Sequence, residues 1–408
     1  MKKSITQHIC GALIIVACLV STGVRAEESP FREKPLSPSG MLQMAEPNAP
    51  LVQIAILLDT SGSMEGLIDQ ARAELWSIVN EFLFAERGDR RPEIQVALYE
   101  YGNTGLKAES GWIRQIVPLT TDLDRISEEL FALKTNGGDE YCGWVIKDAT
   151  EKLQWSRSAE DLKVIFIAGN EPFTQGPVDY RQSCQAAVAK GILVNTIHCG
   201  GEQEGLEGQW ENGAVIADGR YLNIDQNRQI VHVAAPQDKE IAELGARLNA
   251  TYIPYGQQGH AAQERQAMQD NNALHASPQA VIQRTVTKSS QNYMNAGWDL
   301  VDAVKGNRLD LDKLQDEDLP KDMQSMNAEQ RASYVNAKAK ERSELQARVQ
   351  KLNEQRTKYL AEETVKQQQG KTLGSAVQQA IREQAQKKNY TFKPADNPKD
   401  PNQAATAK

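Results

Sequence analysis

The stretch LVQIAILLDTSGS, residues 51–63, is the first part of the chain with a clear structural pattern. Seven of the eight residues from Leu51 to Leu58 are aliphatic, as expected of a central parallel strand that is covered on both faces. A polar run from Asp59 to Ser63 follows, and apolar side chains then return at helical spacing. A strand, a polar loop and a helix in this order predict the first unit of an α/β fold.

The same alternation of strand and helix continues downstream. Further apolar runs predict strands at residues 94–101, 163–168, 191–198 and 219–224, and helical patterns occupy residues 67–85, 143–155 and 180–190. Parallel strands that are joined by helices have right-handed crossovers. The expected fold class is therefore α/β, with a doubly wound, mostly parallel sheet.

The polar loop after the first strand carries oxygen donors at alternate positions. Asp59 supplies a carboxylate, and Ser61 and Ser63 supply hydroxyls; these are ligands that Mg²⁺, Mn²⁺ and Ca²⁺ prefer. Gly62 lets the backbone turn so that both hydroxyls face one point. The loop also follows the carboxyl end of a strand, where doubly wound folds bind ligands. A simpler alternative is that Asp59 caps the following helix, but one cap needs only one such residue.

Asp59-x-Ser61-x-Ser63, set between an aliphatic strand and an amphipathic helix, resembles the metal-ion-dependent adhesion site of von Willebrand factor A (VWA) domains. By the order of its elements the resemblance covers roughly residues 51–225, about half of the chain. It implies a Rossmann-like VWA fold and a bound divalent cation, with Mg²⁺ expected first and Ca²⁺ or Mn²⁺ as alternatives. It also implies an adhesion or scaffolding role, in which a protein partner supplies a carboxylate or another oxygen ligand.

The two other ligand loops of that family have counterparts here that depart from the family pattern. The family usually offers a threonine after a Gly-rich turn; here Asp139 follows two glycines and is assigned as the ligand, with Thr135 as the alternative. The family's third loop commonly contains Asp-Gly, whereas here Asn170 follows the strand and is assigned as a ligand, with Glu171 as the alternative. A second carboxylate would neutralise the cation further and weaken its attraction for an acidic partner.

The sequence lacks the common signatures of enzymes. It contains no HExxH, no GxSxG, no phosphate-binding GxxxxGKS/T and no GxGxxG after the first strand. We therefore expect a binding module and no enzymatic activity. Two alternatives stay open: a metal-dependent hydrolase that uses Glu140 or Glu171 as its base, and a structural envelope protein that binds no metal.

The N-terminus has the pattern of an export signal. Two lysines open the chain, residues 9–20 are apolar, and Val24-Arg25-Ala26 offers small residues at the positions that a signal peptidase reads. Residues 1–26 are therefore predicted to be a signal peptide, which would place the protein in the periplasm or outside the cell. A lipoprotein anchored through Cys18 is the alternative, and only then is a membrane an expected partner.

The balance of charge argues against nucleic acid as a partner. Removal of the signal peptide takes three positive charges from a chain of net charge −8 and leaves −11. Binding to phosphates needs a basic surface, and no basic cluster is present in the sequence.

Three cysteines, Cys142, Cys184 and Cys199, follow the predicted cleavage site. In an oxidising compartment two of them can pair. Cys199 ends a predicted strand and Cys184 opens the preceding helix, so both should lie near one edge of the sheet and are the first candidates for a disulfide. Cys142 is an alternative partner for either.

The rest of the chain divides by composition. Residues 27–50 are predicted to be a Pro-rich linker, 51–256 the VWA-like domain, 257–290 a polar hinge, 291–392 a helical region and 393–408 a disordered tail. A capping box at Asn327 and Gln330 predicts a long helix through Val365. Apolar residues on this helix fall at coiled-coil spacing for about two heptads, and packing on neighbouring helices of the same chain is the alternative.

Overall fold

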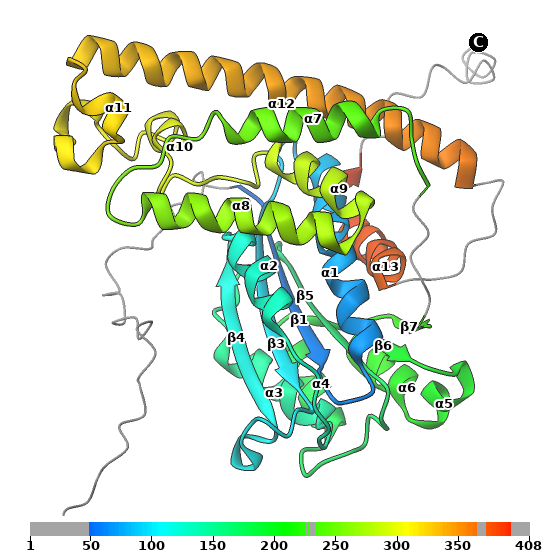
Figure 1. Ribbon diagram of the computed structural model, residues 1–408. Helices are drawn as coiled ribbons and strands as arrows, with labels where there is room; N and C mark the ends of the chain where they lie inside the picture. Colours follow the sequence, from blue (N-terminus) through cyan, green and yellow to red (C-terminus); the bar gives the residue numbers. More distant parts are fainter. Residues whose placement is uncertain (1–48, 226, 228–232, 365–372, 393–408) are drawn as a thin grey trace, which may run out of the picture. The chain divides into compact units, whose positions relative to one another are not determined.

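The computed structural model describes residues 49–225, 227, 233–364 and 373–392 (Figure 1). Its centre is a six-stranded sheet of order β4-β3-β1-β5-β6-β7. The strands are β1 (Leu51–Asp59), β3 (Glu93–Tyr101), β4 (Ile113–Thr120), β5 (Leu162–Gly169), β6 (Leu193–Cys199) and β7 (Tyr221–Ile224). All neighbours are parallel except β4, which is antiparallel to β3. The predicted doubly wound, mostly parallel sheet is confirmed.

Helices cover both faces of the sheet, which explains the aliphatic run of β1. Ile54 and Leu58 enter one core with α1 (Glu65–Asn80), α2 (Leu123–Ala132) and α13 (Leu373–Lys387). Ala55 and Leu57 enter a second core with α3 (Cys142–Lys152), α4 (Tyr180–Ala189) and α6 (Trp210–Ile216). Since successive side chains of a strand point to opposite faces, a strand between two cores is apolar at nearly every position.

The structure differs from the prediction of a polar hinge at residues 257–290. These residues form α8 (Gly259–Ala276) and α9 (Pro278–Lys288), and α9 packs on α1. The Ser277 hydroxyl caps α9 by accepting from the Ala280 N–H at 3.0 Å, and Pro278 stands at the first helical position. The amphipathic pattern of these helices is weak because several of their buried positions carry polar side chains.

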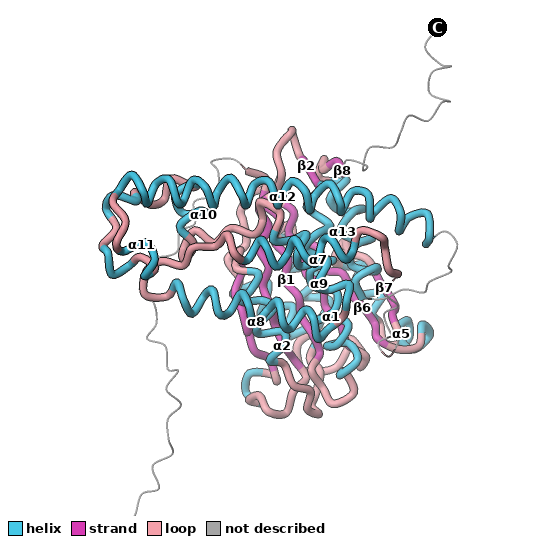
Figure 2. Tube along the Cα trace, turned by 45° about the horizontal axis from the view of Figure 1, so that its top comes forward, coloured by secondary structure: helices cyan, strands magenta, loops and turns pink. Residues whose placement is uncertain are grey.

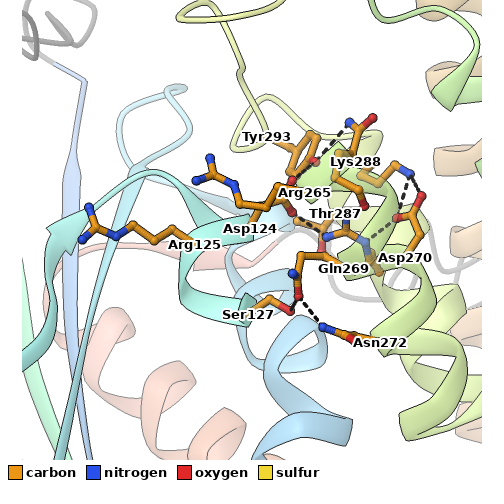
Figure 3. Close-up of polar contacts among 12 residues, drawn as sticks. Asp124, Arg125, Ser127, Arg265, Gln269, Asp270, Asn272, Thr287, Lys288 and Tyr293 are labelled. Atoms are coloured by element: carbon orange, nitrogen blue, oxygen red, sulfur yellow. Dashed lines mark hydrogen bonds and ion pairs between the residues drawn. The ribbon is translucent and has the colours of Figure 1, made fainter. Parts of the chain in front are cut away.

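Those polar side chains form a buried network between α2, α8 and α9 (Figure 3). The Arg284 guanidinium donates to Asp124 Oδ1 at 2.7 Å and also contacts Asp270. The Tyr293 hydroxyl donates to the other oxygen of Asp124 at 2.6 Å, and Lys288 Nζ donates to Asp270 Oδ2 at 2.9 Å. Charged groups are rarely buried unless they are paired. The network therefore joins the helices after the sheet to the sheet domain itself.

The helical region that follows packs on its own neighbours. It contains α10 (Leu300–Lys305), α11 (Lys321–Gln324) and α12 (Ala328–Thr364). The predicted capping box is present, since Asn327 and Gln330 exchange two hydrogen bonds of 2.9 Å. Leu345, Val349 and Leu352 of α12 pack against α7 (Asp238–Asn249) and α9 rather than remaining free for a coiled coil, and Figure 2 shows α7 alongside α12.

Helix α13 returns to the sheet domain and packs along α1. Its Gln384 exchanges two buried amide hydrogen bonds with Asn195 of β6. A short strand after it, β8 (Thr391–Phe392), pairs with β2 (Ala85–Glu86). None of the described helices is long and apolar enough to cross a membrane. The predicted signal peptide, the linker up to residue 48 and the tail after residue 392 lie outside the described residues.

Candidate metal centre

Two strand-end loops and the loop before α3 meet at the carboxyl edge of the sheet. The Asp59 carboxylate ends β1, and its Oδ1 accepts from the Ser61 N–H at 2.7 Å. The Ser61 and Ser63 hydroxyls are 3.3 Å apart. From the loop after β5, the Asn170 amide donates to Ser63 Oγ at 3.3 Å. The structure thus brings together four of the five residues assigned from the sequence.

The remaining loop contributes Glu140 rather than Asp139 to this cluster. Glu140 is buried, and a Cβ placed on Gly102 would lie 2.7 Å from Glu140 Cγ and 2.8 Å from Asp59 Oδ1. Gly102 has φ +76°, so a residue without a side chain is needed where these two carboxylates pack against the backbone. Asp139 is exposed, and its Oδ2 accepts from the Tyr141 hydroxyl at 3.2 Å.

The two alternative ligands lie at the margins of the cluster. Thr135 is half-buried, and the next residue, Asn136, donates its N–H to the Thr60 carbonyl at 2.9 Å. Glu171 is half-buried, and its charge adds to the effect of burial in raising the pKa of Glu140. Glu171 therefore adds to the negative potential of the cluster.

Burial makes the two inner carboxylates difficult to ionise, and the contact with Glu140 adds to this effect for Asp59. Burial, followed by the contact with Glu140, raises the pKa of Asp59 well above its usual value. Burial also raises the pKa of Glu140. Two carboxylates in one site repel each other when both are charged. A positive charge placed between them would reverse this effect and favour the ionised forms.

Three buried oxygens of the cluster lack a hydrogen-bond partner among the residues that the structure describes: Asp59 Oδ2, Glu140 Oε2 and Asn170 Oδ1. Buried polar atoms are nearly always satisfied, and leaving one without a partner costs about 1–3 kcal/mol. All three are hard oxygen donors that come from different loops, so the set fits Mg²⁺, Mn²⁺ or Ca²⁺. No group of three or more His, Cys, Asp or Glu side chains suited to a metal occurs in the described ranges. Any cation here would therefore depend on hydroxyl and amide oxygens as well.

The helix-cap alternative for Asp59 does not agree with the structure. Helix α1 begins at Glu65, its cap position is Met64, and no side chain makes a capping hydrogen bond there. Asp59 lies too far before the helix for this role.

The predicted disulfide between Cys184 and Cys199 is wrong. Cys142, Cys184 and Cys199 are all free and buried. Cys184 packs in the core with α3 and α4, whereas Cys199 packs in the core with α1 on the opposite face of the sheet. The two residues lie on opposite faces of the sheet, which the sequence pattern alone did not show.

A family model and several solved structures match parts of this chain. The family model described as "von Willebrand factor type A domain" matches residues 53–209. Among solved structures, the conserved hypothetical protein BatB from Bacteroides thetaiotaomicron matches at 18% identity and TM-score 0.33, over 43% of this chain and 90% of that chain. The VWA domain of SpRpn10 matches at 16% identity and TM-score 0.33, over 44% and 90%.

A third match is the pilus adhesin SpaC from Lactobacillus rhamnosus GG, at 16% identity and TM-score 0.33, over 44% of this chain and 28% of that chain. The comparison with curated proteins gave no match. The family model and the strand order together carry the assignment. The chain therefore contains a von Willebrand factor type A domain, followed by a helical C-terminal region.

Proposed function

We propose that the VWA domain binds a protein partner through a divalent cation held by Asp59, Ser61, Ser63, Glu140 and Asn170. VWA domains are typically non-enzymatic interaction modules. The observation that carries the proposal is the set of three buried oxygens from three loops that have no hydrogen-bond partner among the described residues. Such a set is costly without a ligand and suits a hard cation.

The residues of the cluster have distinct roles in this proposal. Asp59 and Glu140 supply the charge that offsets a divalent ion, and Ser61 and Ser63 supply hydroxyl oxygens. Ser63 is exposed whereas Ser61 and Asp59 are buried, so the site is open to solvent on the Ser63 side. A partner oxygen, from a carboxylate or a neutral group, would reach the ion from this side. Mg²⁺ is the expected ion, with Ca²⁺ and Mn²⁺ as alternatives.

Glu140 replaces Asp139 as the proposed second-loop ligand because of its burial and its contact with Asp59. This assignment also bears on the hydrolase alternative. A general base must be free to accept a proton from water, whereas a Glu140 that holds the cation is occupied. Of the two bases considered for a hydrolase, only Glu171 remains. Its proposed role here is to add to the negative electrostatic potential at the edge of the cluster.

Export is part of the proposal. The positive start, the apolar residues 9–20 and the small residues before position 27 support a signal peptide. We therefore propose that partner binding takes place in the periplasm or outside the cell.

Removal and return of the cation test the metal site. We expect EDTA to lower the melting temperature of the full mature chain, and Mg²⁺, Mn²⁺ or Ca²⁺ in excess over the chelator to restore it. A ligand at 100 times its Kd stabilises the native state by about 2.7 kcal/mol. The measurement is a thermal melt in each buffer. A melting temperature that does not respond to any of the three ions would contradict the proposal.

Partner binding is tested with the immobilised protein and an envelope extract. We expect the same proteins to be retained in Mg²⁺ and lost in EDTA, and a Ser63→Ala variant in Mg²⁺ to retain less of them. Ser63 is exposed, so its truncation should leave the fold unchanged. Retention that is equal in Mg²⁺ and EDTA would overturn cation-dependent binding.

A further inference from the structure

His198, the penultimate residue of β6, lies beside the third loop of the candidate metal centre. Its side chain is 1% exposed. The ring nitrogen Nε2 is 3.3 Å from the backbone oxygen of Asn170, and Nδ1 is 3.1 Å from Nδ2 of Asn223 on β7. The ring thus bridges the last strand of the sheet and the loop that carries Asn170.

The contacts of Asn223 fix which ring nitrogen carries the proton. Nδ2 of Asn223 also lies 3.1 Å from the Gly200 carbonyl and 3.4 Å from the carbonyl of His198. Both carbonyls accept hydrogen bonds, so this end of the amide is the donating NH₂ group. His198 Nδ1 must then accept, and the proton of the neutral ring lies on Nε2. His198 Nε2 therefore donates to the backbone oxygen of Asn170.

Packing holds the ring in this orientation. A Cβ on Gly205 of α5 (Glu202–Glu207) would lie 2.8 Å from the ring, so only glycine leaves room for the imidazole there. On another side the Trp210 ring lies with its centroid 5.7 Å from that of His198. Because packing already confines the side chain, forming the hydrogen bond costs little further rotamer freedom.

The backbone oxygen that His198 contacts belongs to a candidate ligand of the metal centre. Asn170 stands where a carboxylate would bind a cation more strongly, and its amide oxygen is a weaker, neutral donor. The Asn170 amide also donates to Ser63 Oγ at 3.3 Å, so its placement affects two of the three loops. The Asn170 Oδ1 is buried and lacks a hydrogen-bond partner among the described residues, and a hydrogen bond to the Asn170 backbone would restrict its position.

We propose that His198 is a positioning residue for the candidate metal centre: its Nε2–H holds the Asn170 backbone so that the Asn170 amide oxygen faces the cation. The inference rests on the proposed function, since it requires that the centre binds a cation. Partners in the outer shell of a metal site typically change metal affinity by about 10–100-fold when they are replaced.

The test compares two replacements of His198 in the full mature chain. His198→Phe keeps the ring volume and removes the donor, whereas the amide nitrogen of His198→Gln can take the place of Nε2. Mg²⁺ and Mn²⁺ are titrated calorimetrically into chelator-treated protein, and melting temperatures are measured without metal. We expect a loss of affinity of about 10–100-fold for His198→Phe and of less than about 10-fold for His198→Gln.

Asn195→Ala serves as the matched control on the same strand. It removes the two buried hydrogen bonds that Asn195 exchanges with Gln384 of α13, on the face of the sheet opposite to Trp210. This variant should melt at a lower temperature without metal but bind the ion as the wild type does. If His198 had only a structural role, His198→Phe would also melt at a lower temperature without metal and bind the ion as the wild type does.

Each outcome decides the inference. Wild-type affinity in His198→Phe, or an equal loss in both His198 variants, overturns it while the proposed function stands. A wild-type chain that binds neither ion overturns both. Should His198→Phe fail to fold, Asn223→Ala removes the contact that sets the ring tautomer; unchanged affinity in that variant would also overturn the inference.

Discussion

Replacing Arg284 by alanine is expected to lower the free energy of unfolding by about 3–5 kcal/mol. The Arg284 and Asp124 side chains are only 2% and 5% exposed, and they pair at 2.7 Å. Removing the guanidinium leaves the Asp124 carboxylate buried, with the Tyr293 hydroxyl still donating to it, and also takes a contact from Asp270. Urea unfolding of the full-length chain measures the loss.

The matched control is Arg265→Ala, which breaks an ion pair of similar length in the same region. Arg265 pairs with Asp122 at 2.7 Å, but the two side chains are 29% and 36% exposed. Water can solvate the Asp122 carboxylate after the change, so the expected cost is about 0.2–1 kcal/mol. Equal losses in the two variants would show that the buried network does not hold the helical region to the sheet domain.

Replacing Asp59 by asparagine is expected to abolish the stabilisation that a divalent cation provides, about 2.7 kcal/mol at 100 times the Kd. It should also make the metal-free protein less sensitive to pH. The pKa values of Asp59 and Glu140 are both raised by burial. The folded state therefore keeps protons that the unfolded chain releases, and this contribution to stability is complete below about pH 4 and is lost as pH rises through the raised values.

The measurement is urea unfolding in EDTA between pH 5 and pH 8. The wild type should lose stability across this range relative to Asp59→Asn, because only the wild type must ionise two neighbouring buried acids. Asp139→Asn is the control, since Asp139 is exposed and should leave the pH profile unchanged. Parallel profiles for the wild type and Asp59→Asn would contradict the account of the cluster.

The fold could be predicted because the central strands β1 and β5 are nearly continuous aliphatic runs. The edge strand β4 was not predicted, since only Ile113 and Val117 are buried in it and most other positions are exposed or half-buried. The sequence favours a hinge at α8 and α9 for a related reason. Their buried positions include Gln266, Gln269 and Arg284, which bind side chains far away in the sequence. Polar residues at buried positions give no hydrophobic periodicity in the sequence.

The sequence predicts those residues of the candidate site that stand at the ends of regular strands. Asp59, Ser61, Ser63 and Asn170 follow strands whose ends meet at one edge, so their convergence follows from the order of the elements. Asp139 and Glu140 lie in an irregular loop. Such a loop has no hydrophobic periodicity that would indicate which of two adjacent acids points into the protein. Helix α3 starts at the buried Cys142, close to Glu140 in sequence, but only the folded loop shows that Glu140 contacts Asp59.

The central claim is that Asp59 and Glu140 hold one cation together. Calorimetric titration of Mg²⁺ and Mn²⁺ into chelator-treated wild type, Glu140→Gln and Asp139→Asn tests it most directly. We expect one ion per chain in the wild type and in Asp139→Asn, and no measurable binding in Glu140→Gln. Binding that survives in Glu140→Gln and disappears in Asp139→Asn, or no binding in the wild type, would contradict the claim.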